Sequence, residues 1–186
     1  MSLLELTAVI FGIICVVLTI KQHIACWPTG LVMVILYIWI FYEARLFSDV
    51  ALQVVYIFLQ IYGWYHWAKG GNRDNPLPVT LLSWKARLAW GLVALLGTLV
   101  LGYSMNRWAA ASLPYWDATA AVLSLIAQWF LARKLLESWV VWIAVDVLSI
   151  GIYGVKGLYL TMGLYFLFLG LATAGLLAWR KEWRTA

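Results

Sequence analysis

A carboxylate in the middle of an apolar run is the residue of this sequence best suited to chemistry. Asp146 lies near the centre of WVVWIAVDVLSIGIYG, residues 139–154. A charged side chain at the middle of a bilayer costs about 3 kcal/mol on insertion scales, and acids at that depth usually mark a substrate or ion pathway. We therefore treat Asp146 as a candidate binding residue.

Asp146 shares one helical face with residues that follow at steps of three and four, namely Trp139, Trp142, Ser149 and Tyr153. Polar and aromatic residues have the same spacing in the apolar runs 49–68 and 158–179, and run 116–132 contributes an amide. The candidate binding residues are Gln53, Tyr56, Trp64, Gln128, Trp142, Asp146, Tyr153 and Tyr165.

These residue types favour one class of cargo. Aromatic faces suit a flat ring, above all a cationic one. Amides and hydroxyls suit sugar hydroxyl groups, and the apolar runs carry no Lys or Arg in their central parts that could pair with a phosphate. The pattern predicts a neutral or positive, ring-bearing, sugar-like solute. A structural alternative remains for each Gln or Ser, because such side chains also join membrane helices for about 0.6 kcal/mol.

The composition predicts that lipid is the solvent of this protein. Hydrophobic residues make up 65% of the 186 residues and charged residues only 11%, whereas about 25% is usual for a soluble domain. The chain also holds 13 Trp and 10 Tyr. Trp27, Trp67, Trp139 and Trp179 lie at the ends of apolar runs, so we expect them to be interfacial anchors.

Seven runs are long enough to cross a bilayer, which takes about 20 apolar residues. We predict an all-α integral membrane protein of one domain, residues 1–186, with spans at 3–20, 27–43, 49–68, 86–104, 116–132, 139–155 and 158–179. The segment 69–87 is rich in Gly, Asn and Pro and forms the main internal boundary.

The basic residues predict the orientation of these spans. With alternating loops, all Lys and Arg except Arg45, Arg107 and Lys156 fall on one side. Cytoplasmic loops carry the excess of Lys and Arg. We therefore expect a cytoplasmic C-terminus and a periplasmic N-terminus.

When the sequence is aligned with itself without gaps, its first part matches its last part at one offset, which indicates an internal repeat. This shift carries Thr7 onto Thr119, Trp27 onto Trp139, Gly63 onto Gly175, Trp67 onto Trp179 and Lys69 onto Lys181. The shift spans an even number of helices, so both copies cross the membrane in the same direction. We predict a 3+1+3 plan: a three-helix repeat at 3–68, a linker helix at 86–104 and a second three-helix repeat at 116–179. Parallel repeats of this kind occur in SWEET transporters, with substrate bound between the repeats near the midplane.

Other functional classes fit less well. An enzyme would need a nucleophile with a base, or a metal cluster, but His23 and His66 both lie at span ends. We expect no metal, no cofactor and no nucleic-acid partner. Proton-coupled transport through Asp146 remains an alternative, although relays often use several acids in series.

Several stretches resemble the PnuC nicotinamide riboside transporters of bacteria. The resemblance covers nearly the whole chain and is carried by IACWPTGLV (24–32), FYEARLFSDVALQVVY (41–56), IYGWYHW (61–67) and WVVWIAVDVLSIGIYGVKGLYLTMGLY (139–165). It implies a SWEET-like fold, a homotrimer in the inner membrane, and facilitated diffusion of nicotinamide riboside that is trapped by phosphorylation inside the cell. The substrate contacts it implies are Gln53, Tyr56, Trp142, Asp146 and Tyr165, and further Trp64 and Tyr153. A related ring-bearing vitamin or nucleoside-like solute is the alternative cargo.

Overall fold

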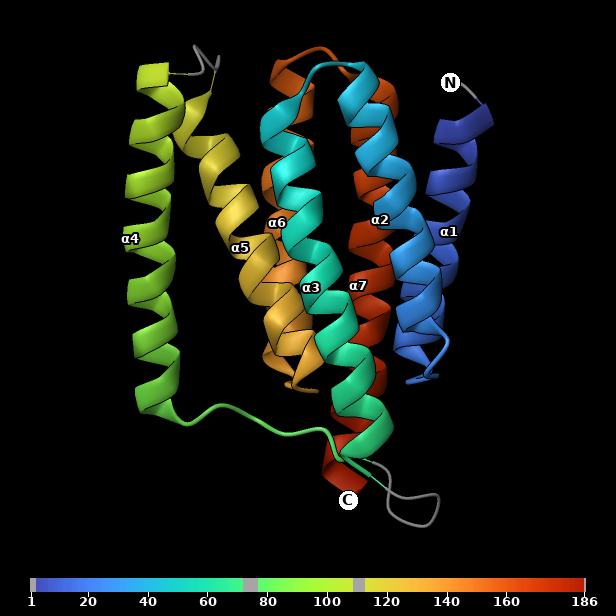
Figure 1. Cartoon of the computed structure of the whole chain (residues 1–186). Coiled ribbons are helices and arrows are strands. Elements are labelled where there is room, and N and C mark those ends of the chain that lie inside the picture. The colour runs from blue at the N-terminus through green and yellow to red at the C-terminus, as the bar shows by residue number, and fades with distance from the viewer. Residues whose placement is uncertain (1–2, 72–76, 109–112, 186) are drawn as a thin grey trace.

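The computed structural model describes residues 3–71, 77–108 and 113–185, and these residues form seven helices (Figure 1). The helices are α1 (Leu3–Ile20), α2 (Cys26–Glu43), α3 (Phe47–Lys69), α4 (Trp84–Trp108), α5 (Pro114–Ala132), α6 (Glu137–Val155) and α7 (Tyr159–Thr185). Each covers one of the spans expected from the sequence, and α7 continues past Trp179. The prediction of an all-helical chain is confirmed.

The helices run alternately up and down, so α1 begins at one end of the bundle and α7 finishes at the other (Figure 1). We call the end where α7 finishes the basic end. Its described basic residues are Lys21, Lys69, Lys85, Arg87, Arg133, Lys134, Arg180, Lys181 and Arg184. Arg45, Arg107 and Lys156 lie at the opposite end, and Arg73 lies outside the described residues. The separation of basic residues on which the predicted orientation depends is therefore present in space.

Five of the seven helices are long and apolar enough to cross a membrane by length and composition: α1, α2, α4, α6 and α7. The other two, α3 and α5, carry the amides Gln53, Gln60 and Gln128. They contact each other inside the bundle. Gln60 and Gln128 are buried, so these two helices place amide groups against protein.

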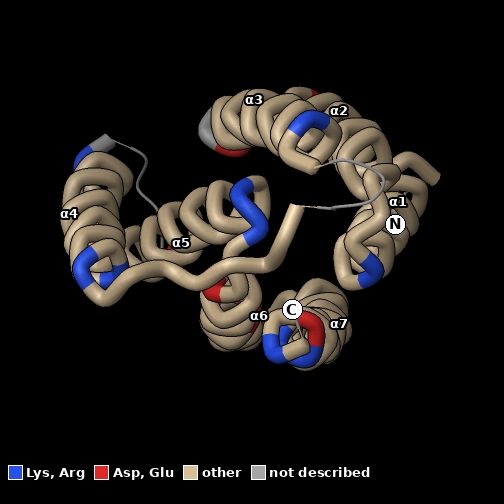
Figure 2. Tube along the Cα trace, turned by 90° about the horizontal axis from the view of Figure 1, so that it is seen from below, with Lys and Arg blue, Asp and Glu red and all other residues tan. Residues whose placement is uncertain are grey.

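The bundle consists of two arcs of three helices, with α4 at the side (Figure 2). In the first arc α2 lies between α1 and α3, and in the second α6 lies between α5 and α7. The arcs meet where α3 contacts α5 and where α1 contacts α7. In the described part of the chain, α4 packs along α5, and an ion pair between Arg87 and Glu137 joins its first turn to the start of α6.

The expectation of interfacial anchors is wrong for four tryptophans. Trp27, Trp67, Trp139 and Trp179 are 1%, 8%, 2% and 0% exposed and form the core of the basic end. Trp27 meets Trp67 edge to face at 5.3 Å, and Trp139 meets Trp179 in the same way at 5.5 Å. Glycines make this possible: a Cβ on Gly63 would lie 2.1 Å from the Trp27 ring, and one on Gly175 would lie 2.6 Å from the Trp139 ring.

A reciprocal pair of hydrogen bonds joins the two arcs at this core. The Trp67 indole N–H donates to the Leu131 carbonyl at 3.2 Å, and the Trp179 indole N–H donates to the Thr19 carbonyl at 3.2 Å. The two rings lie 6.0 Å apart between centroids. Each arc therefore supplies one donor from its third helix and one acceptor from its first.

The turns of the two arcs also match. Gln22 and Lys134 have φ values of 53° and 54°, and they follow α1 and α5, respectively. Arg45 and Gly157 have φ values of 58° and 71°, and they follow α2 and α6. A residue with positive φ just after a helix is a common C-terminal cap. Both pairs have the spacing of the shift that aligns Trp27 with Trp139.

Two glycines on α7 provide a matched test of the tryptophan core. Gly175→Ala adds a methyl group where the Trp139 ring lies, and overpacking of this kind typically costs about 1–3 kcal/mol. Gly170→Ala meets nothing within 4 Å and gains up to about 1 kcal/mol of helix propensity. We expect the melting temperature of the purified protein in detergent to fall for Gly175→Ala and to hold or rise for Gly170→Ala. Equal melting temperatures for the two variants would contradict this packing.

Candidate functional site

A hydrogen bond between α3 and α5 connects the arcs at mid-depth. The Tyr56 hydroxyl donates to Ser124 Oγ at 2.6 Å, and the Ser124 hydroxyl donates to the Ala121 carbonyl at 2.8 Å. One turn further along α5, Gln128 is buried. Tyr56 and Gln128, both predicted site residues, thus belong to the two helices that form the seam between the arcs.

Two further amides, Gln53 and Gln60, lie on α3. Gln53 Oε1 is buried and has no hydrogen-bond partner among the described residues. Gln60 is 4% exposed, and its amide lies so close to α2 that a Cβ on Gly30 would be 2.2 Å from Nε2. Gly30 therefore makes room for Gln60. The role of Gly30 cannot be predicted from the helical spacing of polar and aromatic residues, because glycine has no side chain that such a pattern could include.

Asp146 occupies the middle of α6 and is 4% exposed. Among the described residues its carboxylate forms no hydrogen bond and no ion pair. An ionised carboxylate in such surroundings is unfavourable unless a partner or a metal is bound. Trp142, one turn earlier, is partly buried and packs against the tryptophan core. The face predicted from the sequence thus points into the protein.

Tyrosines from α6 and α7 continue this face toward the opposite end. Tyr153 and Tyr165 stack with centroids 5.2 Å apart and an interplanar angle of 28°. Tyr165 lies near Ser149, which is 4% exposed. Tyr165 also lies within electrostatic range of Tyr56 on α3. Tyr153, Tyr165 and Tyr56 therefore belong to one region shared by both arcs.

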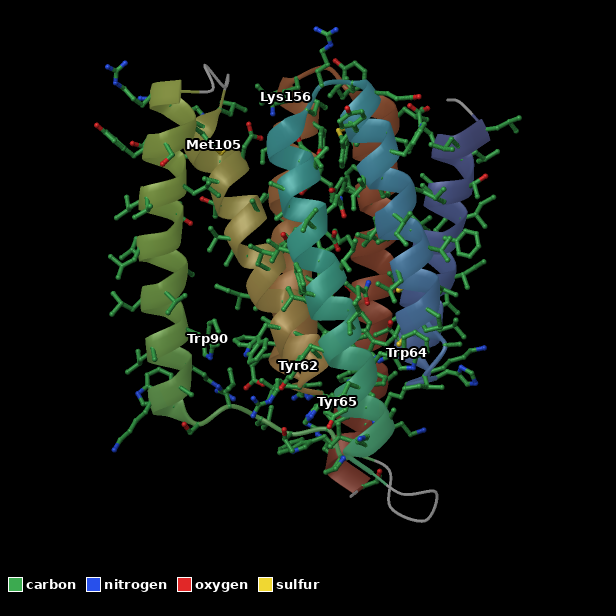
Figure 3. All side chains as sticks on the ribbon, in the orientation of Figure 1. Tyr62, Trp64, Tyr65, Trp90, Met105 and Lys156 are labelled. Carbon is green, nitrogen blue, oxygen red and sulfur yellow. The ribbon has the colours of Figure 1, made fainter. Side chains whose placement is uncertain are left out.

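Trp64 stands apart from the other predicted residues, since 40% of its surface is exposed. It lies on α3 toward the basic end, where Tyr62 and Tyr65 also lie, whereas Lys156 marks the opposite end (Figure 3). Tyr62 is the residue of this group that stacks on α5, with its ring 5.0 Å from the Trp129 ring. Tyr62 was not among the predicted site residues.

The region can accept hydrogen bonds and stack rings, but it has little means of holding a metal. No group of three or more His, Cys, Asp or Glu lies close enough to bind an ion in the part of the chain that the structure describes. What it offers is a buried carboxylate, a buried amide oxygen, several hydroxyls and aromatic faces. These groups fit a ring-bearing ligand with hydrogen-bond donors or a positive charge.

Comparisons with known proteins show that this chain is similar to transporters. A family model described as nicotinamide mononucleotide transporter matches residues 2–181. The nicotinamide riboside transporter PnuC of Escherichia coli (strain K12) is 27% identical over 208 residues, which cover 96% of this chain and 85% of that protein. The riboflavin/roseoflavin transporter RibM of Streptomyces davaonensis is 25% identical over 173 residues, which cover 91% of this chain and 81% of that protein.

A solved structure is also similar over nearly the whole chain. The crystal structure of the vitamin B3 transporter PnuC superimposes with a TM-score of 0.80 at 25% sequence identity, covering 98% of this chain and 82% of that chain. These three relatives are named as transporters and not as enzymes.

Proposed function

The chain belongs to the family of nicotinamide mononucleotide transporters, together with the PnuC nicotinamide riboside transporters, and we propose on that premise that it carries nicotinamide riboside across a membrane. The observation that carries this proposal is the buried Asp146 carboxylate, which has no partner among the described residues. Nicotinamide riboside supplies what such a group lacks, since it has a pyridinium charge, a carboxamide N–H₂ and ribose hydroxyls. Gln53 Oε1, also buried and unpartnered, is a second acceptor for these donors.

The aromatic residues support the same cargo. A cation over an aromatic face gains about 0.5–2 kcal/mol, with the larger values in desolvated sites. We assign Trp142 to stacking with the pyridinium ring, because it lies one turn from Asp146 on the same face of α6. Tyr56, Tyr153 and Tyr165 bind the ribose hydroxyls, and Gln128 completes the proposed site. Trp64, which is 40% exposed and lies toward the basic end, is the predicted residue that we leave outside it.

We assign the mechanism to facilitated diffusion, with phosphorylation inside the cell as the trap. A proton relay would need several acids in series. Besides Asp146, the acids Glu5, Asp49, Asp117 and Glu137 lie in the first turns of their helices. Asp146 alone among these five is at mid-depth, which favours uncoupled transport. The likeness to RibM makes a riboflavin-type solute the second candidate cargo.

The architecture we propose is the 3+1+3 plan in the inner membrane, with residues 3–68 and 116–179 as copies of one repeat and 86–104 as the linker helix. The paired tryptophan contacts and paired turns support the repeat. The repeats are related by a parallel arrangement of SWEET type. The assembly is a homotrimer, as the family resemblance implies.

Transport is tested by flux into liposomes. Purified protein in proteoliposomes should equilibrate labelled nicotinamide riboside down its gradient, without a pH gradient and with the solute recovered unchanged. If uptake requires a proton gradient, the mechanism is proton-coupled transport and not facilitated diffusion. Selective uptake of riboflavin would replace the cargo but leave the transport function.

We predict that the site discriminates against phosphate. No Lys or Arg lies in the central part of any helix, so the dianion of nicotinamide mononucleotide would be unpaired and close to Asp146. We expect calorimetry to show binding of the mononucleotide at least about tenfold weaker than that of the riboside, which corresponds to about 1.4 kcal/mol. Equal affinities would contradict the proposed site and favour the mononucleotide named in the family description.

A second prediction concerns Asp146 itself. Asp146→Asn keeps the shape and part of the hydrogen bonding and should weaken riboside binding mildly. Asp146→Leu should weaken it by roughly 1–3 kcal/mol, the usual cost of losing a hydrogen bond to a charged group, and Trp142→Ala should weaken it through lost stacking.

The control is Val147→Ala, because Val147 is the next residue on α6 and is 55% exposed. Binding affinity and melting temperature should be measured together. If Asp146→Leu lowers the melting temperature but binds the riboside normally, the carboxylate has a structural role.

The orientation gives a third prediction. We place the basic end in the cytoplasm, because positive residues gather in cytoplasmic loops. A reporter fused at the C-terminus should be active only in the cytoplasm, and one fused after Arg107 only in the periplasm. The reverse pattern would invert the assigned orientation.

A further inference from the structure

The segment 77–83, which we call the strap, runs along the basic end from beneath the bundle to the start of α4 (Figure 1). It pairs with the turn between α5 and α6. The Thr80 N–H donates to the Lys134 carbonyl at 3.1 Å, and the Leu136 N–H donates to the Thr80 carbonyl at 3.0 Å. Val79, next to this bridge, is 5% exposed and belongs to the tryptophan core. The strap is therefore part of the packed structure at this end.

The side chain of Lys134 binds the strap. Its ammonium group donates to the Leu77 carbonyl at 2.7 Å and lies 4.9 Å from the centroid of the Trp67 ring. The residue is only 4% exposed. Burial lowers the pKa of Lys134, and the carboxylate of Glu182 acts in the opposite direction. One side chain thus holds the strap, the α5–α6 turn and a tryptophan of the other arc together.

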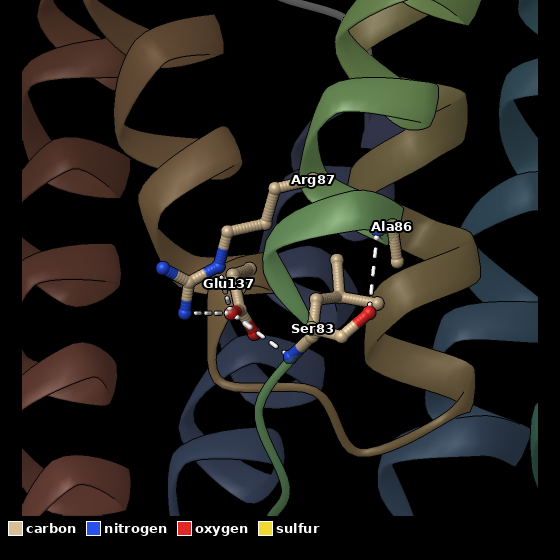
Figure 4. Close-up of polar contacts among 5 residues, drawn as sticks. Ser83, Ala86, Arg87 and Glu137 are labelled. Atoms are coloured by element: carbon tan, nitrogen blue, oxygen red, sulfur yellow. Dashed lines mark hydrogen bonds and ion pairs between the residues drawn. The ribbon is translucent and has the colours of Figure 1, made fainter.

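Glu137, at the start of α6, fastens the far part of the strap (Figure 4). Its carboxylate accepts from the Leu82 N–H at 3.0 Å and from the Arg87 guanidinium at 2.8 and 3.1 Å. Ser83 Oγ accepts from the Ala86 N–H at 3.3 Å and caps the first turn of α4. The α5–α6 turn is therefore tied to α4 as well as to the strap.

The matching turn between α1 and α2 has no such fastening among the described residues. Gln22 occupies the place of Lys134 with the same backbone conformation. It donates to the carboxylate of Glu182 in an exposed contact. The indole bond from Trp179 to Thr19 is matched by that from Trp67 to Leu131, so it does not distinguish the turns. Ile24 is 39% exposed, whereas its counterpart Leu136 is 8% exposed, and His23 is exposed where its counterpart Leu135 is half-buried.

We propose that the strap fixes the α5–α6 turn in place, so that the basic end opens on one side only, by movement of the α1–α2 turn away from α7. Two matching arcs would otherwise open symmetrically. Besides the indole bond at each turn, the α5–α6 turn is held by two backbone bonds, a buried ammonium and a carboxylate with three donors, and the α1–α2 turn by one exposed side-chain contact. The inference rests on the proposed transport function only in that this end must open to release solute.

Hydrogen exchange of the unmodified protein tests the asymmetry without any ligand. The His23 N–H bonds to the Leu18 carbonyl at 2.9 Å, and the Leu135 N–H bonds to the Phe130 carbonyl at 3.0 Å. The local geometry is the same, so a difference in exchange reports how firmly each turn is held. We expect peptides covering 18–25 to exchange at least about tenfold faster than those covering 130–137. Equal exchange, or faster exchange in 130–137, would overturn the proposal.

Two variants and one control test whether the strap is the cause of the slower exchange in 130–137. Lys134→Met removes the ammonium bond, and Arg87→Gln with Glu137→Gln removes the ion pair. Each should raise exchange in 130–137 toward that of 18–25 while the helical circular dichroism is retained. Gln22→Met is the matched control and should leave 130–137 unchanged. Unchanged exchange in 130–137 in all variants would overturn the strap as the cause. Failure of riboside flux with the asymmetry intact would count against the cargo and not against the strap.

Discussion

The two indole N–H groups of Trp67 and Trp179 hold the arcs together at the basic end, and the rest of the arrangement depends on this contact. Each donates to a backbone carbonyl of the other arc. A net gain of about 0.5–1.5 kcal/mol for each hydrogen bond gives about 1–3 kcal/mol for the pair. That amount favours a closed basic end by roughly one or two powers of ten. It is a small free energy, comparable to that of one or two hydrogen bonds elsewhere in the protein.

The core at this end also explains why the site can be polar. Burial of four indoles against one another and against Gly63 and Gly175 provides packing that does not rely on the mid-depth residues. The middle of the bundle can therefore carry Asp146 and Gln53 with unsatisfied oxygens. A binding site that leaves acceptors open in the absence of ligand needs such support elsewhere, since each buried unpaired polar group opposes folding.

The helices and the buried face of α6 that carries Asp146 were predictable from the sequence, whereas the role of the tryptophans was not. Apolar runs and the spacing of Trp142, Asp146 and Tyr153 depend only on neighbours in the chain, and helical geometry converts that spacing into a face. The position of Trp27 at the end of an apolar run predicts that it lies at the membrane–water interface, but its packing partner Gly63 is on a different helix. Contacts of that kind depend on how helices pack, which hydropathy does not encode. The contact between Gly30 and Gln60 cannot be predicted from the sequence for the same reason, since Gly30 lies on a different helix and its function is to leave space for Gln60.

The tryptophan core gives the protein a natural optical signal. Trp67 and Trp179 lie 6.0 Å apart and each meets a further indole edge to face at 5.3 or 5.5 Å. Chromophores this close in a fixed, chiral arrangement couple their electronic transitions, and the coupling changes sign and size with the angle between the rings. The aromatic circular dichroism therefore depends on whether the two arcs are joined, and coupled indoles contribute to the far-ultraviolet spectrum beside the helix signal. These four rings are among 13 Trp in the chain, so their share is the part of the spectrum that changes when one of them is replaced, and it can be followed with no label attached to the chain.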